Sequence, residues 1–100
     1  MSKGSQYLMA VKDSRVTAIV HVSTGATGNT PIGTFRIYRK NAGWDWVLWY
    51  PMYFLRGFAI HGYPSVPAWP ASHGCVRIPL WLASGLRERW GYGSLVRVYS

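Results

Sequence analysis

The sequence predicts a mostly β protein: a β-sandwich of mixed strands with one short helix in the C-terminal half. Eleven glycines and six prolines are spread along the 100 residues, and they separate short apolar runs of the kind that form strands. Only the stretch 79–90 has apolar side chains at helical spacing. A chain of this length buries about two-thirds of its unfolded surface, so residues 1–100 are expected to form a single domain.

The first predicted element is a β-hairpin. Two apolar runs, 6–12 and 16–22, flank the short polar segment 13–15, which is typical of a turn between antiparallel strands. Apolar side chains recur at every second position of the second run, so this strand is expected to have one buried face. These positions are Val16, Ala18, Val20 and Val22.

Loops and strands alternate through the middle of the chain. Residues 23–34 are rich in Gly, Thr, Asn and Pro, which predicts a loop. A strand at 34–38 and a basic turn at 39–41 follow. A further short strand, 57–61, ends at a histidine. The segment 63–71 contains three prolines and is therefore expected to be irregular.

Seven of the fifteen residues from 44 to 58 are aromatic. Two interpretations are open. Aromatic side chains dominate burial in protein cores, so the segment can be a strand packed in the core. Alternatively, it forms a wall or lid of a substrate groove.

The predicted helix spans 79–90, and a closing strand follows at 95–99. Pro79 suits the first helical position, and Gly91 suits the position after the last one. An apolar stripe at helical spacing marks the buried face. It consists of Leu82, Ala83, Leu86 and Trp90.

The chain is strongly basic, with eleven Lys and Arg against three Asp and Glu and a net charge of +8. Such a charge attracts anionic partners, such as wall polymers, nucleic acid or lipid headgroups. The alternative is a basic surface with no specific partner. No apolar segment approaches the ~20 residues of a membrane helix, and the first residues lack the apolar stretch of a signal peptide.

Four residues with catalytic side chains lie within fifteen positions: His61, Ser72, His73 and Cys75. A thiolate is a strong nucleophile, and a neighbouring histidine makes it available near neutral pH. Because His61 ends a predicted strand, it can face Cys75 from across the sheet. We expect Cys75 to be the nucleophile and His61 its base. The backbone N–H groups around Gly74 and Cys75 are expected to bind an oxyanion.

No carboxylate lies near this cluster in the sequence, so a backbone carbonyl is the expected partner that orients the base. The shortage of acids argues against glycoside hydrolysis, which needs a pair of carboxylates. His61, His73 and Cys75 alternatively offer three zinc ligands, but their spacing fits no common zinc pattern. We therefore expect neither a metal ion nor a cofactor. His21 alternates within a strand and is expected to be structural.

The cluster belongs to a longer pattern that resembles the catalytic domain of L,D-transpeptidases, the YkuD-type family. Residues 72–77 read Ser-His-Gly-Cys-Val-Arg and match the family signature Ser/Thr-His-Gly-Cys-x-Asn/Arg. Residues 59–62, Ala-Ile-His-Gly, match its upstream histidine element. Residues 23–25 and 30–35 resemble the loop and strand ahead of the site. The resemblance covers nearly the whole chain and implies a β sandwich with a small helix. Because only four residues separate Met1 from Gln6, the first strand of this fold is expected to be shorter here than is usual for the family.

The resemblance implies an acyl-transfer reaction. Cys75 would attack the carbonyl of the third residue of a donor stem peptide and expel the terminal D-alanine. His61 would be the general base, with its ring oriented through the backbone at Gly62. The thioester would then pass to an amine of a second stem, giving a 3→3 crosslink, or to water, giving carboxypeptidase activity.

The other motif residues would bind the substrate. Ser72, His73 and Gly74 would shape the oxyanion pocket and the donor groove. Arg77 would fix the loop or contact a substrate carboxylate.

The implied partners are peptidoglycan stem peptides as donor and acceptor, with carbapenem-type β-lactams as inhibitors, in the periplasm or cell wall. The main alternative is a basic aromatic module that binds cell-wall polymer or nucleic acid without turnover. No RNA-binding fingerprint is present, so we expect no specific nucleic-acid partner.

Overall fold

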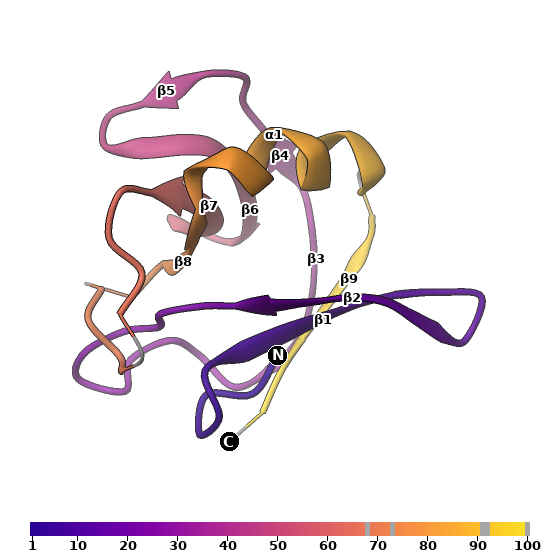
Figure 1. Cartoon of the computed structure of the whole chain (residues 1–100), viewed down its shortest axis with the longest axis horizontal. Helices are drawn as coiled ribbons and strands as arrows, with labels where there is room; N and C mark the ends of the chain where they lie inside the picture. Colours follow the sequence, from indigo (N-terminus) through magenta and orange to yellow (C-terminus); the bar gives the residue numbers. More distant parts are fainter. Residues whose placement is uncertain (68, 73, 91–92, 100) are drawn as a thin grey trace.

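The computed structural model describes residues 1–67, 69–72, 74–90 and 93–99 (Figure 1). Within them the chain is mostly β, with three sheets and one helix, α1 (Leu80–Arg89), in its C-terminal half. The predicted fold class is therefore confirmed. In Figure 1, α1 lies below β5 and above the first hairpin, and this hairpin lies below the largest sheet.

The largest sheet carries the strands that position the reactive residues. Its order is β4-β6-β7-β8, and β5 pairs with β6. All its neighbours are antiparallel except β7 and β8, which run parallel. Parallel strands need a crossover connection, and the Pro-rich segment between them provides it. The strands are β4 (Arg39–Lys40), β5 (Trp44–Asp45), β6 (Leu48–Leu55), β7 (Phe58–Tyr63) and β8 (Val76–Pro79).

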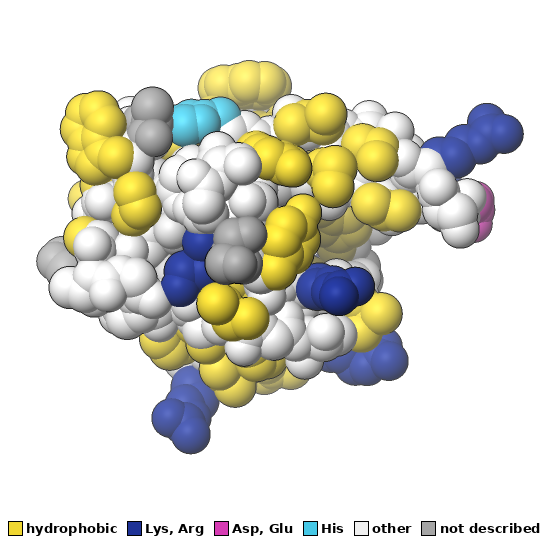
Figure 2. Space-filling view, turned by 90° about the horizontal axis from the view of Figure 1, so that it is seen from below, with side chains coloured by type: hydrophobic (Ala, Val, Ile, Leu, Met, Phe, Trp, Pro, Cys, Tyr) yellow, Lys and Arg dark blue, Asp and Glu magenta, His cyan; other side chains and the backbone are white. Residues whose placement is uncertain are grey.

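The predicted hairpin is confirmed as β1 (Tyr7–Lys12) and β2 (Arg15–His21). Asp13 and Ser14 connect them with φ of 51° and 64°, as a tight turn between twisted strands requires. Val16 was expected to be buried, but it is 52% exposed. The reason is that the end of the hairpin projects beyond the core, as Figures 1 and 2 show.

The remaining small sheet pairs β3 (Gly33–Arg36) with β9 (Leu95–Val98). Side chains from all three sheets and from α1 form one hydrophobic core. Its fully or almost fully buried members include Val22, Ile37, Met52, Ile60, Val76, Ile78, Ala83, Leu86 and Val98.

The loop between β7 and β8 is fixed to the first hairpin. The ring Nε2 of His21 lies 3.0 Å from the carbonyl oxygens of Val66 and Pro67. The hydroxyl of Ser23 donates to the carbonyl of Trp69 at 2.7 Å. His21 thus holds a loop in place, in keeping with its expected structural role.

Some predicted boundaries were wrong. Residues 39–40 were expected in a turn, but they form β4, because their backbone pairs with Tyr53 and Met52 of β6. Pro79 precedes the first helical residue instead of occupying it, since it is still paired with β7. The helix ends at Arg89, and Gly91 lies outside the described residues.

The core interpretation of the aromatic segment 44–58 is confirmed for part of its length, and the alternative, a wall or lid of a substrate groove, stays a prediction. Phe54 and Tyr53 are buried in β6, whereas Trp44 and Trp46 are exposed. The segment is a core strand at its C-terminal end and an exposed hairpin at its N-terminal end.

Truncation of the core should destabilise the domain strongly. Met52 is fully buried at the centre of the core, so Met52→Ala should lower the free energy of unfolding by about 2–5 kcal/mol. Ile19, which is 70% exposed, is the control, and Ile19→Ala should change it by less than about 0.5 kcal/mol. Urea unfolding of both variants measures the difference. Equal losses would show that the core is placed wrongly.

Candidate active site

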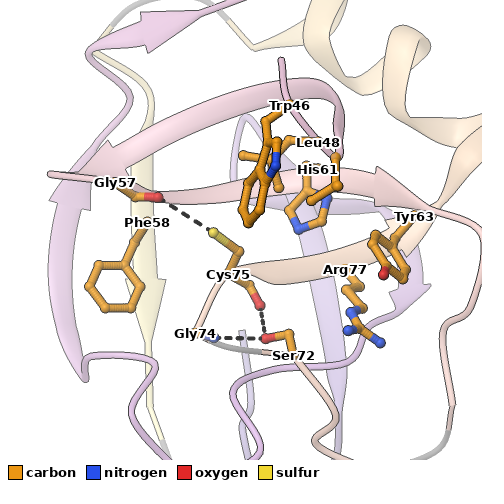
Figure 3. A pocket seen from close by; sticks show the side chains of 11 residues that line it. Trp46, Leu48, Gly57, Phe58, His61, Tyr63, Ser72, Gly74, Cys75 and Arg77 are labelled. Carbon is orange, nitrogen blue, oxygen red and sulfur yellow. Dashed lines mark hydrogen bonds between the residues drawn. The ribbon is translucent and has the colours of Figure 1, made fainter. Parts of the chain in front are cut away.

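A pocket of about 420 Å³ opens where the start of β8 meets β7 and the β5–β6 hairpin (Figure 3). Five of the predicted site residues line it: His61, Ser72, Gly74, Cys75 and Arg77. Gly62 contributes through its backbone, and His73 lies outside the described residues. The other lining residues are Trp46, Val47, Leu48, Gly57, Phe58 and Tyr63.

His61 lies on β7 and is only 2% exposed. Its Nδ1 lies 2.8 Å from the carbonyl oxygen of Gly62. Because a carbonyl can only accept, Nδ1 carries the proton and Nε2 is left with its lone pair. A backbone carbonyl therefore orients the ring, as expected from the sequence.

Burial keeps His61 neutral. Burial is the largest cause that lowers the pKa of the imidazole, and the charge of Arg77 adds to it. The hydrogen bond to Gly62 opposes them, and the resulting pKa is about 4. At neutral pH the ring is thus an unprotonated base with a fixed orientation.

Cys75 is partly buried, and its Sγ donates to the carbonyl oxygen of Gly57 at 3.5 Å. Burial raises the pKa of the thiol, and a hydrogen bond from the backbone of Ala59 opposes this. A thiol has one hydrogen, so in this conformation it is not shared with His61. Figure 3 shows the sulfur directed toward Gly57, while His61 lines another wall of the pocket.

The turn before Cys75 is closed by Ser72. Its hydroxyl donates to the carbonyl of Cys75 and accepts from the backbone N–H of Gly74 at 3.1 Å. Gly74 has a φ of +144°, and a Cβ there would lie 2.7 Å from the ring of Phe58. Only glycine fits this position.

The loop between β2 and β3 supports this turn from behind. Thr30 donates its hydroxyl to the carbonyl of Gly74 at 2.7 Å and accepts from the N–H of Gly25 at 2.8 Å. The N–H of Ala26 donates to the carbonyl of Ser72 at 2.8 Å. Sequence reasoning missed the role of Thr30, because only the fold reveals that this hydroxyl is buried.

Arg77 is the cation of the pocket. Its guanidinium lies 4.1 Å from the ring centroid of Tyr63, a distance at which a cation is attracted to an aromatic face. Among the described residues, those that line the pocket include no Asp or Glu, and the ion pair found in that part of the chain joins Arg39 and Asp45. Arg77 is therefore available to an anionic group of a ligand.

In the described part of the chain, no group of three His, Cys, Asp or Glu side chains is placed to hold a metal ion. The zinc alternative includes His73, which lies outside that part. No described helix has the length and apolar character to span a membrane.

A thiol and a neutral, oriented imidazole in one pocket define the class of site used by thiol-dependent acyltransferases and hydrolases. The sequence pattern of the YkuD family, the L,D-transpeptidase catalytic domain, matches residues 1–98, and the chain belongs to this family. No curated protein matches the chain.

Three solved structures illustrate the similarity. An L,D-transpeptidase from Xylanimonas cellulosilytica is 36% identical with a TM-score of 0.91, over 99% of this chain and 58% of that one. One from Stackebrandtia nassauensis is 28% identical with a TM-score of 0.88, over 99% and 53%. The enzyme LdtMt1, solved in complex with imipenem, is 19% identical with a TM-score of 0.87, over 98% and 56%. The chain therefore spans little more than half the length of these structures.

The buried imidazole makes stability pH-dependent. An unfolded histidine titrates near pH 6.5 and the folded one near 4, so between these values only the unfolded state binds the proton. The contribution of His61 to the free energy of unfolding should be fully present above pH 6.5. As the pH falls toward 4, protonation of the histidine in the unfolded state should lower this free energy by about 3 kcal/mol. Urea unfolding at pH 7 and pH 4.5 measures this, with His61→Gln as the control. An equal pH dependence in the control would mean that His61 is not the cause.

Proposed function

We propose that this domain is a cysteine-dependent acyltransferase that acts on peptidoglycan stem peptides and forms 3→3 crosslinks through a thioester. The observation that carries the proposal is that Cys75 of the signature motif and a neutral, oriented His61 of the upstream element line one pocket. The same pocket offers a guanidinium and aromatic walls to a peptide donor.

The reaction starts when the donor peptide enters and the Cys75 side chain turns from Gly57 toward His61. Nε2 of His61 takes the thiol proton, and the sulfur attacks the carbonyl carbon of the third stem residue. Collapse of the tetrahedral intermediate breaks the bond to D-alanine, whose nitrogen receives the proton from His61. An amine of a second stem then attacks the thioester and gives up its proton to His61. The carbon–sulfur bond breaks, and the sulfur takes this proton from His61 to restore the thiol and the neutral imidazole. Water in place of this amine gives carboxypeptidase activity.

The oxyanion is bound by the backbone around the nucleophile. We assign the N–H of Cys75 to this role. The N–H of Gly74 already donates to Ser72, so it contributes only if that hydrogen bond is exchanged. Ser72 otherwise keeps the turn in shape. The assignment of His73 to the donor pocket remains a prediction from the motif.

Arg77 binds a carboxylate of the donor. Its position beside Tyr63 holds the guanidinium at the edge of the pocket, and a guanidinium forms paired hydrogen bonds with a carboxylate.

Carbapenem-type β-lactams are the proposed inhibitors, because their strained carbonyl can acylate the thiol of Cys75. LdtMt1, which shares this fold, has been solved in complex with imipenem. We also propose an extracytoplasmic location, where these substrates are found.

The scattered Lys and Arg side chains in Figure 2 form no single basic patch on that face, which does not favour the nucleic-acid alternative.

Acylation should depend on Cys75. Intact-mass spectrometry after incubation with a carbapenem should show a gain of one drug mass in the parent and none in Cys75→Ala. Cys75→Ser should lose nearly all turnover of a tetrapeptide donor. A folded parent that forms no adduct would contradict the proposal and favour a binding module without turnover.

Removal of the guanidinium should weaken donor binding. Arg77→Gln loses a charge-assisted pair of about 1.5–3 kcal/mol, so the KM for a tetrapeptide donor should rise about 10- to 100-fold. Arg36→Gln, on β3 and outside the pocket, is the control. A donor with an amidated C-terminus should show a much smaller effect of Arg77→Gln if the terminal carboxylate is the group bound. An unchanged KM for all donors would rule out this role.

A further inference from the structure

Trp46 occupies an unusual position in the wall of the pocket. It is the first residue of a two-residue turn, because Asp45 on β5 is paired with Leu48 on β6. Its side chain extends into the pocket (Figure 3) and is nevertheless 84% exposed. The indole therefore gains little from packing in the free protein.

The backbone at Trp46 favours a different residue. Its φ is +56°, in the left-handed region where tight hairpin turns usually place glycine, asparagine or aspartate. A bulky side chain there is strained. Strained residues persist where the surrounding structure determines their conformation, and they gather at functional sites.

Asp45 fixes the turn from the residue before it. One carboxylate oxygen accepts from the hydroxyl of Tyr53 at 2.5 Å and from the side-chain amide of Asn41 at 2.9 Å, and it lies 3.5 Å from the guanidinium of Arg39. Across the two strands, Trp44 of β5 is paired with Trp49 of β6, and their tilted rings lie with centroids 4.9 Å apart. The conformation of the turn is thus determined at its base.

The same anchor reaches the nucleophile. Tyr53 packs with Leu48 and Ala59 in a small cluster against which Cys75 rests. The hydroxyl of Tyr53 holds Asp45 while its ring supports the wall behind Cys75. The position of the Trp46 turn and the position of the thiol are therefore set by one group of side chains.

We propose that Trp46 is a specificity-determining residue whose indole is a fixed wall of the donor site, and that Asp45 is the positioning residue that holds it there. The inference rests on the function proposed above. The indole offers a flat apolar surface on the side of the pocket opposite Phe58, so an extended donor peptide lies between two aromatic walls with its scissile carbonyl at Cys75. The strain is offset when the donor covers the indole.

The test compares stability with acylation in Trp46→Gly. Glycine adopts the left-handed turn without strain, so the melting temperature should stay unchanged or rise by up to about 5 °C. The value of kcat/KM for acylation of Cys75 by a tetrapeptide donor, followed by intact mass, should fall about tenfold or more, chiefly because KM rises. Unchanged acylation would overturn the role of the indole, and a lower melting temperature would overturn the strain.

Two variants serve as matched controls outside the pocket. Ser14→Gly relieves a left-handed φ of 64° in the first hairpin, and Trp81→Ala removes an indole that is 79% exposed on α1. Both should acylate at the parent rate. A slower acylation of Ser14→Gly would show that loss of strain anywhere slows the reaction, and a slower acylation of Trp81→Ala would show the same for loss of any exposed indole. Either result would contradict the role of Trp46.

Asp45 is tested by its coupling to Trp46. Asp45→Asn keeps the shape but loses the charge, and Tyr53→Phe removes one donor, so each should lower the acylation rate about threefold to tenfold. In the Asp45→Asn, Trp46→Gly double variant the losses should not add, because Asp45 acts through the indole. Additive losses would assign Asp45 a separate role. If the parent itself is not acylated, the proposed function fails, and this inference fails with it. If the parent and Trp46→Gly are acylated equally, only this inference fails.

Discussion

The parallel pairing of β7 with β8 is the constraint on which the site depends. It places His61 opposite Arg77 and Ile60 opposite Val76, and Cys75 directly precedes β8. The strands lie side by side because the chain crosses over between them through the Pro-rich loop. That loop is held to the first hairpin by His21 and Ser23. A shift of one residue would turn His61 away from the pocket, because side chains alternate between the two faces of a strand.

Burial determines the charge states of the reactive pair. It lowers the pKa of His61 and raises that of the Cys75 thiol, so both groups are neutral in the free pocket. Transfer of the proton from sulfur to nitrogen is therefore unfavourable without a substrate. The thiol donates meanwhile to Gly57. In the mechanism proposed above, the thiolate of Cys75 forms only when the donor is bound, and this would protect it from oxidation, since the thiolate is the species that reacts.

The elements that sequence reasoning found are those with local signals. The first hairpin follows from alternation around a polar turn, and the helix follows from its apolar stripe. The motif around Cys75 pointed to residues that line one pocket, and their catalytic roles stay predictions. The strands β4 and β8 were not predicted, because residues 39–40 and 76–79 are paired only through distant partners. The role of Thr30 was missed for a similar reason, and Trp46 was not singled out within the segment 44–58 that was offered as a wall or lid of a groove. No sequence pattern predicts that a hydroxyl is buried or that a tryptophan has a left-handed backbone conformation. Only the folded chain shows what these side chains contact.

The use of acidic residues supports a functional origin for the Trp46 turn. The chain has three Asp and Glu against eleven Lys and Arg, and Asp45 binds three donors at the base of this turn. Glycine at position 46 would form the turn without such an anchor. A sequence under selection for stability alone would have little reason to combine a strained, exposed tryptophan with a scarce carboxylate. The combination has a purpose if the Trp46 indole must be ordered before the donor binds. Donor binding then does not include the entropy cost of ordering this side chain.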